Sequence, residues 1–363
     1  MGRGDAGRDT PGRPVAGRHA RWAGLILAWW VVMAVACVAQ AGVAQAGPSP
    51  TLAAVRARGA VACGIAGTVA GFSLPDAQGV MRGLDADWCR AVAAAVFGDA
   101  RRVTYVPTTV QNRFTALQSG EVDLLVRQTT WTLAREAGLG LLAAGVNFYD
   151  GTAFLVRRGS GVTRADQLDG ATVCMQPGSS TELMVADWFR QHGRTFHPLL
   201  IEDVTEVRAA VLAGRCDAYA TDGSALATFR ATQGAHADDY TVLPDRISRE
   251  PLGAMVRQGD DGWFNIVRWS LFAQILAEEE GLTSADVAAA RAGSTAPDVR
   301  RLLGVEGDLG AALGLRASWA YDIIREVGSY AEMWDRDIAP LGLARGLNAL
   351  WTKGGLMYAP PLR

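Results

Sequence analysis

The chain contains polar residues whose types suit the two charged ends of a free α-amino acid. Arg135, Thr130 and Thr132 offer a guanidinium and two hydroxyls for an α-carboxylate, because the planar fork of arginine matches a carboxylate in shape and charge. Ser180 stands where a helix is expected to begin, and the free N–H groups at that end of a helix attract anions. Asp222 offers a carboxylate for the α-ammonium group. Together these residues predict a site for a zwitterion.

Each of these residues has a more ordinary explanation when it is taken alone. An arginine after a strand is most often a solvated surface residue, and serines before a helix usually serve only as caps. Asp222 beside Gly223 is also typical of a turn. The prediction therefore depends on a repeat that brings the residues together.

Two segments of the chain resemble each other and place these polar residues at equivalent positions. Residues 116–126 (ALQSGEVDLLV) and 210–220 (AVLAGRCDAYA) each have the pattern of a helix end, a glycine, a polar turn and an apolar strand. The first strand leads into Gln128, Thr130 and Arg135, and the second into Asp222. Open α/β sheets bind ligands at the carboxyl ends of their strands, so we expect the two sets to meet across a cleft. The aspartates at positions 123 and 217 precede the strands, which predicts structural roles.

Strands alternate with helices along most of the chain, which predicts an α/β fold with parallel strands. Strands are expected at residues 60–65, 103–106, 122–126 and 171–175, and helices near 112–118, 183–192 and 263–280. The length suits two lobes. We expect one lobe to consist of residues 47–150 and 251–363, and the other of residues 151–250. The mostly helical segment 281–315 is an addition to the first lobe whose role is open.

The first 46 residues have the order of a secretory signal peptide. Arginines come first, then an apolar stretch from Trp22 to Val38, then small-residue cleavage sites at 39–41 and 44–46. This stretch of about 17 residues is shorter than the roughly 20 that a membrane-spanning helix needs, so an anchor is the weaker alternative. Lipid attachment at Cys37 is a third alternative. The signal peptide predicts export.

The composition argues against several other classes of function. The chain has 35 Lys and Arg against 37 Asp and Glu and no basic cluster, so we expect no nucleic-acid partner. Its histidines and cysteines lack metal-ligand spacing, so we expect no metal and no cofactor. Four cysteines follow the signal peptide, and an even number in an exported chain predicts disulfides with three possible pairings. These cysteines are Cys63, Cys89, Cys174 and Cys216.

Several long stretches resemble one protein family. The chain is similar to the periplasmic solute-binding proteins of polar amino-acid ABC transporters (family 3), and most of all to their general L-amino-acid-binding branch. The resemblance covers about residues 51–363. It is carried by residues 113–123 (RFTALQSGEVD), 129–132 (TTWT), 148–151 (FYDG), 216–222 (CDAYATD) and 345–361 (RGLNALWTKGGLMYAPP).

The resemblance implies a type II fold, in which two strands cross between two lobes that close over the ligand. It implies that Arg135 binds the α-carboxylate, with help from Thr130 and the backbone at Ser180, and that Asp222 binds the α-ammonium. The four cysteines also match those of the family.

The chain departs from the family pattern around the ligand side chain. Gln128 replaces a frequent Asn, and Gly223 replaces a frequent larger polar residue. Relatives often stack an aromatic ring on the ligand, whereas here Val69 takes that place and Phe72 follows three residues later. We expect Phe72 to line the side-chain pocket. A loosely held side chain predicts broad specificity.

The resemblance implies a receptor without enzymatic activity, which captures L-amino acids in the periplasm and delivers them to the permease subunits of an ABC transporter. We expect a monomer. One alternative is an enzyme of the dehydratase type on the same scaffold. Its nearest acid or base would be Glu182, whose spacing from Ser179 already predicts a helix cap. The other alternative is a ligand sensor for a membrane receptor.

Overall fold

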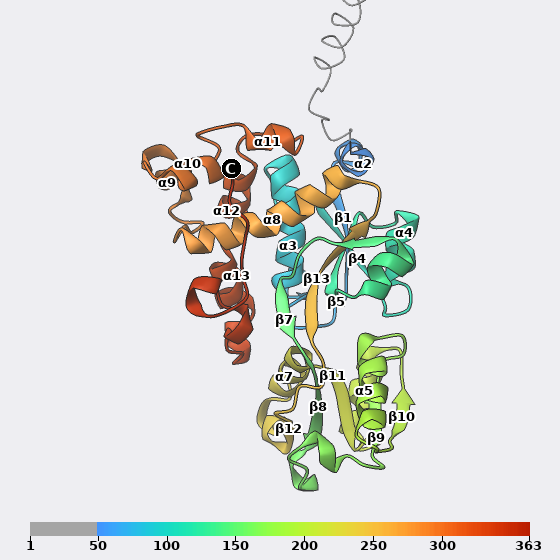
Figure 1. The fold of residues 1–363 in the computed structure, drawn as a ribbon. Helices are drawn as coiled ribbons and strands as arrows, with labels where there is room; N and C mark the ends of the chain where they lie inside the picture. The colour runs from blue at the N-terminus through green and yellow to red at the C-terminus, as the bar shows by residue number, and fades with distance from the viewer. Residues whose placement is uncertain (1–48) are drawn as a thin grey trace, which may run out of the picture. The chain divides into compact units, whose positions relative to one another are not determined.

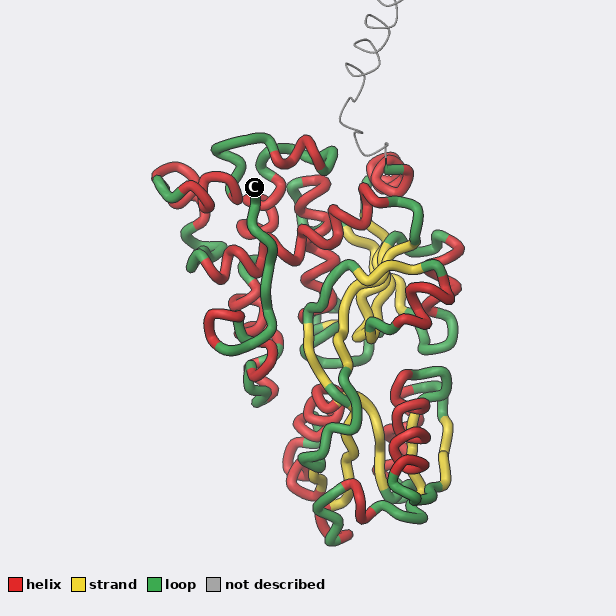
Figure 2. Tube along the Cα trace, in the orientation of Figure 1, coloured by secondary structure: helices red, strands yellow, loops and turns green. Residues whose placement is uncertain are grey.

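The chain folds into two separate large sheets with helices packed on them (Figures 1 and 2). The structure is a computed structural model that describes residues 49–363. The predicted signal peptide and Cys37 lie outside these residues. The predicted α/β class is confirmed. Within the described part of the chain, no helix has both the length and the apolar character needed to cross a membrane.

The first sheet has six strands and is mixed in direction. Its strands are β1 (Val61–Ile65), β4 (Val103–Pro107), β5 (Leu124–Thr130), β6 (Leu141–Ala143), β7 (Phe148–Asp150) and β13 (Glu250–Arg257). The order is β4–β1–β5–β13–β6, with β7 also paired to β13. The strands β4 and β5 run parallel to β1, because helices connect them, whereas β13 runs antiparallel to its neighbours. The helices of this part are α2 (Pro50–Arg58), α3 (Leu84–Phe97), α4 (Arg113–Ser119) and α8 (Asp261–Glu279), and a small hairpin is formed by β2 (Leu74–Pro75) and β3 (Met81–Arg82).

The second sheet has five strands in the order β10–β9–β11–β8–β12. These are β8 (Thr152–Arg157), β9 (Thr172–Met175), β10 (His197–Leu200), β11 (Ala218–Asp222) and β12 (Tyr240–Val242), and its helices are α5 (Ser180–Gln191), α6 (Val204–Leu212) and α7 (Gly223–Ala231). The chain passes between the sheets from β7 to β8 and returns from β12 to β13. Since β7 and β13 pair antiparallel there, with Asp150 opposite Glu250, the crossing strands predicted from the family resemblance are present.

The C-terminal helices extend the core of the first sheet. They are α9 (Val287–Gly293), α10 (Pro297–Leu302), α11 (Leu309–Ala312), α12 (Trp319–Glu326) and α13 (Tyr330–Asp337). Helix α12 packs on α3 and α8, and α13 packs on α8 (Figure 1). Val287, Val299 and Leu303 belong to the same buried cluster as Trp88 of α3. The additional segment 281–315 therefore shares the buried core of the first lobe, where α9 packs on α12.

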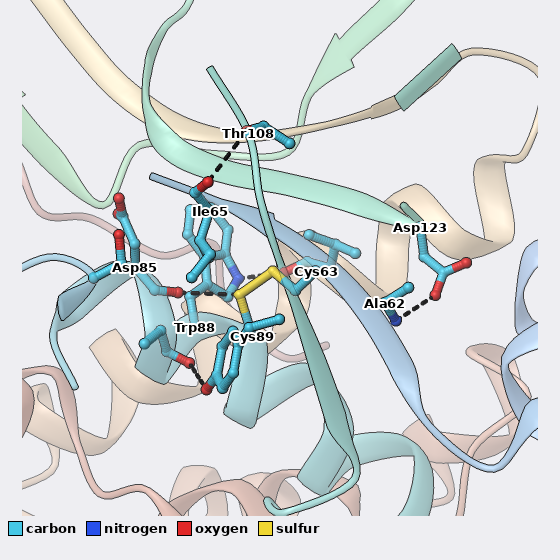
Figure 3. Close-up of a disulfide and its surroundings, with 12 residues drawn as sticks. Ala62, Cys63, Ile65, Asp85, Trp88, Cys89, Thr108 and Asp123 are labelled. Carbon is cyan, nitrogen blue, oxygen red and sulfur yellow. Dashed lines mark hydrogen bonds between the residues drawn. A yellow bond between two sulfur atoms is a disulfide. The ribbon is translucent and has the colours of Figure 1, made fainter. Parts of the chain in front are cut away.

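The two aspartates of the sequence repeat have equivalent structural roles. The carboxylate of Asp123 accepts a hydrogen bond of 2.7 Å from the backbone of Ala62, at the start of β1 (Figure 3). That of Asp217 accepts one of 2.8 Å from the backbone of Thr172, at the start of β9. Each aspartate thus joins its own strand to the neighbouring parallel strand. The predicted structural role of the repeat aspartates is confirmed.

Two disulfides are present, one in each lobe. Cys63 of β1 is bonded to Cys89 of α3, with 6.1 Å between their Cα atoms (Figure 3). Cys174 of β9 is bonded to Cys216, just before β11, with 5.7 Å between their Cα atoms. Both distances are normal for disulfides, and the structure selects this pairing among the three that the sequence allowed. Neither bond links one sheet to the other.

Removing the Cys174–Cys216 bond should lower the free energy of unfolding. The two cysteines are 42 residues apart. Without the bond, the unfolded chain gains the conformational entropy of a loop of that length, which lowers the free energy of unfolding by about 3–4 kcal/mol. Urea unfolding of the Cys174→Ala/Cys216→Ala variant beside the wild type measures this difference. Wild-type protein with both bonds reduced should be at least as destabilised. Equal unfolding midpoints and slopes for the variant and the oxidised wild type would contradict the prediction.

Candidate ligand-binding site

Four of the predicted site residues line one cavity. Gln128 and Thr130 come from the end of β5, Ser180 from the start of α5, and Asp222 from the end of β11. The strand ends of the two sheets therefore contribute to the same cavity, as the repeat predicted. Whether these residues bind a ligand stays a prediction. No group of three His, Cys, Asp or Glu side chains in residues 49–363 is placed to hold a metal ion.

The two hydroxyls meet at a buried carboxylate. Thr130 Oγ1 and Ser180 Oγ lie 3.0 Å apart, although Thr130 ends a strand of the first lobe and Ser180 begins a helix of the second. Both hydroxyls donate to Oε2 of Glu250, which is 1% exposed; the Ser180 bond is 3.1 Å long. Ser248 and Thr152 donate to Oε1 of the same carboxylate, at 2.7 Å and 3.3 Å. We call the group formed by Thr130, Ser180 and Glu250 the hydroxyl–glutamate junction.

The sequence analysis did not identify Glu250 as part of the site. It lies on the strand that returns from the second sheet, more than a hundred residues after Thr130, and no local motif marks it. A hydroxyl has one proton to donate. Thr130 and Ser180 are therefore committed to Glu250 in this arrangement, and a ligand carboxylate would have to take those bonds over.

Arg135 is buried beside the cavity and does not line it directly. It lies in a π-helical turn, Ala134–Gly138, of the kind often found at functional sites. Its Nη1 donates to the carbonyl of Thr130 at 2.6 Å, and its guanidinium lies 5.2 Å from the centre of the Phe114 ring. No other guanidinium nitrogen of Arg135 has a hydrogen-bond partner within residues 49–363. Burial lowers the pKa of Arg135, and Glu250 and Asp222 oppose that shift.

Thr132 also lies outside the cavity lining. Its hydroxyl accepts a bond of 3.3 Å from the backbone N–H of Arg135. Thr132 therefore helps to form the turn that holds Arg135, which is an indirect role compared with the predicted contact to the ligand.

Asp222 lies at the end of β11 with a second carboxylate nearby. Burial raises the pKa of Asp222 well above its ordinary value, and the charges of Asp150 and Glu250 add to this rise. Asp150 is held by the backbone N–H groups of Gly151 and Ser224, at 2.8 Å and 2.9 Å. Without a cation between them, these carboxylates repel one another. An ammonium group placed at Asp222 would relieve that repulsion.

Gly223 is accommodated for a steric reason. A Cβ atom at this position would lie 2.8 Å from Nε of Arg246. A larger residue would need Arg246 to move. Gly223 thus allows the guanidinium of Arg246 to lie close to Asp150. Burial raises the pKa of Asp150, and the charge of Arg246 partly opposes this rise.

A bulge in β5 turns two side chains into the cavity. Thr129 pairs with Gly253 and Val126 with Ala254, so Arg127 and Gln128 are extra residues on their strand. Gln128 has a φ of 41°, a left-handed conformation that is uncommon outside glycine. Both side chains line the cavity, and Nε2 of Gln128 is buried without a partner within the described residues. Arg127 thus faces the cavity and forms no salt bridge within residues 49–363.

Asp85 holds the bulge in place. Its Oδ2 accepts a hydrogen bond of 3.0 Å from the backbone N–H of Gln128, and its Oδ1 accepts one of 2.9 Å from Nδ2 of Asn147. Burial raises the pKa of Asp85 to about 6, although these two bonds and the charge of Arg127 act in the other direction. The carboxyl of Asp85 should therefore titrate in the folded protein at mildly acidic pH.

The Asp85→Asn variant should differ from the wild type in how its stability depends on pH. The pKa of Asp85 is about 6 in the folded protein and has the ordinary value of 3.8 in the unfolded chain, so the folded state holds this proton more tightly. The contribution of the protonated carboxyl to the free energy of unfolding is therefore full below pH 3.8 and is lost as the pH rises through 6. Between these two pH values the free energy of unfolding of the wild type should fall by about 3 kcal/mol relative to that of the variant. Urea unfolding of both proteins at about pH 4 and pH 7 tests this. A difference that does not change with pH would contradict it.

Phe72 does not reach the cavity. It is fully buried in the first core, where its ring lies edge-on to Phe148 at 5.2 Å. Val69 lines the cavity instead, together with Ala66 and Thr68 of the same loop. The expectation that Phe72 contacts the ligand side chain is thus not met. The sequence of this loop does not distinguish an aromatic residue that packs into the core from one that faces a ligand.

Two arginines that were not predicted as site residues also line the cavity. Arg113 begins α4, and Arg208 comes from α6 of the second sheet. Nη1 of Arg208 donates to the carbonyl of Thr68 at 3.1 Å, which is another bond between the two sheets. Arg113 is part of the segment that carries the family resemblance, but nothing in its local sequence indicates that it faces the cavity.

Comparison with known proteins identifies relatives of this chain. The model of a family described as bacterial extracellular solute-binding proteins, family 3, matches residues 61–280. The general L-amino acid-binding periplasmic protein AapJ of Rhizobium johnstonii is 49% identical over 325 residues, which cover 88% of this chain and 95% of the relative. The glutamate/glutamine/aspartate/asparagine-binding protein BztA of Rhodobacter capsulatus is also 49% identical, over 324 residues, with 88% and 96% covered.

A solved structure agrees with these sequence matches. A periplasmic binding protein of an ABC transporter from Brucella ovis, with glutathione bound, has a TM-score of 0.84 and 46% sequence identity to this chain. The match covers 87% of this chain and 100% of that protein. The two-sheet fold described above is therefore the fold of that protein.

Proposed function

This chain belongs to the bacterial extracellular solute-binding proteins, family 3, and from that premise we propose that it binds L-amino acids in the periplasm for delivery to an ABC-transporter permease. The relatives AapJ and BztA, which it matches over nearly their whole length, are named as amino-acid-binding proteins. In this proposal the protein changes nothing covalently in its ligand. It binds, closes, and presents its two lobes to the membrane permease.

The observation that carries the proposal is the meeting of complementary groups from both sheets at one cavity. Thr130 and Ser180 lie 3.0 Å apart across the two sheets, with Arg135 behind Thr130 and Asp222 lining the same cavity. A zwitterion can place its carboxylate toward Arg135 and its ammonium toward Asp222. The first backbone N–H groups of α5, at Ser180 and Thr181, have no partners within the helix and add donors for the carboxylate.

Closure follows from the same geometry. A ligand that contacts β5 on one sheet and α5 and β11 on the other completes its contacts only when the sheets are together, so it shifts the population toward that state. The disulfides do not restrict the movement of one lobe relative to the other, because each joins two elements of the same lobe. The shared backbone contacts, with a side-chain region lined in part by Val69, fit a receptor for several L-amino acids.

Calorimetric titration of the protein with a set of L-amino acids tests the proposal. The protein is first unfolded and refolded to remove any ligand that co-purifies. We expect several L-amino acids to bind, while N-acetylated and decarboxylated analogues, which lack one charged end, bind far more weakly. Equal binding of the analogues, or binding of no amino acid, would refute the proposal. Tight binding of one amino acid alone would refute broad specificity.

The same samples separate a receptor from an enzyme or a sensor. A receptor returns its ligand unchanged after long incubation, whereas a dehydratase on this scaffold would convert it, and chromatography distinguishes the two. A receptor should also stimulate ATP hydrolysis by its reconstituted permease only when the amino acid is present. A sensor would act on a membrane receptor instead of a permease.

A further inference from the structure

A second cavity is formed by the end of α8, by α10 and by the C-terminal end of the chain (Figure 1). It shares no lining residue with the candidate ligand-binding site. Its volume is about 230 Å³, which is below the roughly 300–1,000 Å³ of pockets that enclose a whole small molecule. Helix α10 belongs to the additional segment 281–315. The cavity therefore has a size that suits one side chain, and the additional segment builds part of its wall.

Two aromatic side chains are held at the rim of this cavity by their buried neighbours. Leu350 and Met357 are buried and pair as a β-bridge. The residues that follow them, Trp351 and Tyr358, line the cavity and are 51% and 54% exposed. Their rings lie 5.8 Å apart at an angle of 74°, and Nε1 of Trp351 donates to Oε1 of Glu279 at 3.2 Å. The fold itself thus fixes the two exposed rings next to each other.

Every charged residue in the lining of this cavity is acidic. These residues are Glu279, Glu280 and Asp298. Asp298 pairs with Arg301 of its own helix at 3.0 Å, whereas Glu280 forms no ion pair with any of residues 49–363. Partial burial raises the pKa of Glu280, and the negative charges of Asp298 and Glu279 add to this rise. A cation in the cavity would relieve the repulsion among these carboxylates.

The surface around the cavity has the composition of a protein-binding site. Leu347 and Leu356 are exposed to a similar extent as the two aromatic residues, and a backbone hydrogen bond of 2.8 Å joins them. Residues 347–358 therefore expose four large apolar side chains next to the acidic cavity. Exposed apolar patches mark sites of protein contact, and aromatic residues are enriched there. The carboxylates add a preference for a partner that presents a positive charge among apolar residues.

We propose that this cavity receives an arginine side chain from a partner protein, so that the additional segment 281–315 and the C-terminal end of the chain form a docking surface. In this arrangement the guanidinium lies against the rings of Trp351 and Tyr358, whose faces attract a cation, and beside the carboxylate of Glu280. The methylene groups of the arginine contact the apolar wall of the cavity. Arginine suits the site better than lysine does, because its planar group stacks on aromatic rings. The inference does not depend on which ligand the other cavity binds.

Fluorine NMR of protein labelled with fluorotryptophan tests the docking surface, with the Trp351 resonance assigned from the Trp351→Phe variant. The probe is a capped tripeptide with arginine between two leucines, and the control peptide has citrulline, which keeps the shape without the charge. The arginine peptide should shift the Trp351 resonance saturably and bind about fivefold or more tightly than the citrulline peptide. Glu280→Gln should remove this preference for arginine. Glu121→Gln changes an exposed carboxylate outside both cavities and should keep the preference.

The results distinguish the possible occupants of the cavity. Equal binding of the two peptides, or no shift of the Trp351 resonance, would refute the docking of an arginine, and this comparison on the wild type decides even if Glu280→Gln fails to fold. A saturating L-amino acid should leave the titration unchanged, whereas competition would place the peptide in the other cavity and refute the proposal. Sedimentation of the unlabelled protein should show a monomer. A dimer that Glu280→Gln dissociates would mean that a second copy of this chain fills the cavity, which overturns the proposal of a different partner.

Discussion

The Arg135→Ala variant should bind L-amino acids about 30-fold to several thousand-fold more weakly than the wild type. This is a loss of about 2–5 kcal/mol, the range for truncating one partner of a buried charge pair. Arg135 is 8% exposed, its Nη1 is fixed on the carbonyl of Thr130, and Phe114 lies against its guanidinium. Its remaining donors are therefore held ready beside the cavity, and no flexible side chain has to be ordered when the carboxylate arrives. Calorimetric titration of both proteins with one L-amino acid measures the effect.

Arg268 offers a matched control for this substitution. Its guanidinium lies 3.9 Å from the centre of the Phe264 ring, in an arrangement like that of Arg135 on Phe114. Arg268 donates to the carbonyl of Ala143, which does not line the cavity, whereas Arg135 donates to that of Thr130, which does. Arg268→Ala should leave the affinity unchanged. If Arg135→Ala weakens binding by less than tenfold, or no more than Arg268→Ala does, Arg135 is not the anchor of the α-carboxylate.

The Asp222→Asn variant should weaken zwitterionic ligands by a comparable 2–5 kcal/mol, or about 30-fold and more, because an ammonium loses its buried partner. It should have a much smaller effect on N-acetylated amino acids, which have no ammonium. The raised pKa of Asp222 adds a dependence on pH. Binding requires the ionised carboxylate, so wild-type affinity should fall as the pH decreases through the raised pKa, at values above the ordinary 3.8. The variant should lack this component.

Titrations at several pH values, in buffers of different ionisation enthalpy, measure both the affinity and the protons released on binding. Asp217→Asn is the control, since Asp217 precedes the same strand and bonds to Thr172 away from the cavity. It should keep the wild-type affinity. Equal losses for zwitterionic and N-acetylated ligands would place Asp222 away from the ammonium.

Much of the fold could be predicted because its signals are local. The glycine that ends each helix of the repeat, the apolar strand that follows, and the aspartate between them are all within a few residues of one another. For this reason Asp123 and Asp217 were assigned their structural role from the sequence alone. The same repeat predicted that Thr130 and Asp222 would end their strands at a common cavity.

The rest of the site depends on contacts between distant segments, which leave no local pattern. Glu250 meets Thr130 and Ser180 only through the crossing of the chain between the sheets. Arg113 has the sequence context of an ordinary helix start, although it is buried and lines the cavity. Phe72 illustrates the opposite case, since an aromatic residue in a loop near a ligand site was in fact part of the core.

The hydroxyl–glutamate junction has a consequence for the energetics of the receptor. In the proposed binding mode an incoming carboxylate needs the hydroxyls that Glu250 already binds, so Glu250 would compete with the ligand. The measured affinity would then report the exchange of the Glu250 carboxylate for the ligand carboxylate, and not the full strength of the new contacts. In such a receptor the hydroxyls of Thr130 and Ser180 would stay ordered when no ligand is bound. The ligand would also dissociate readily, because Glu250 is available to accept the hydrogen bonds of these hydroxyls again.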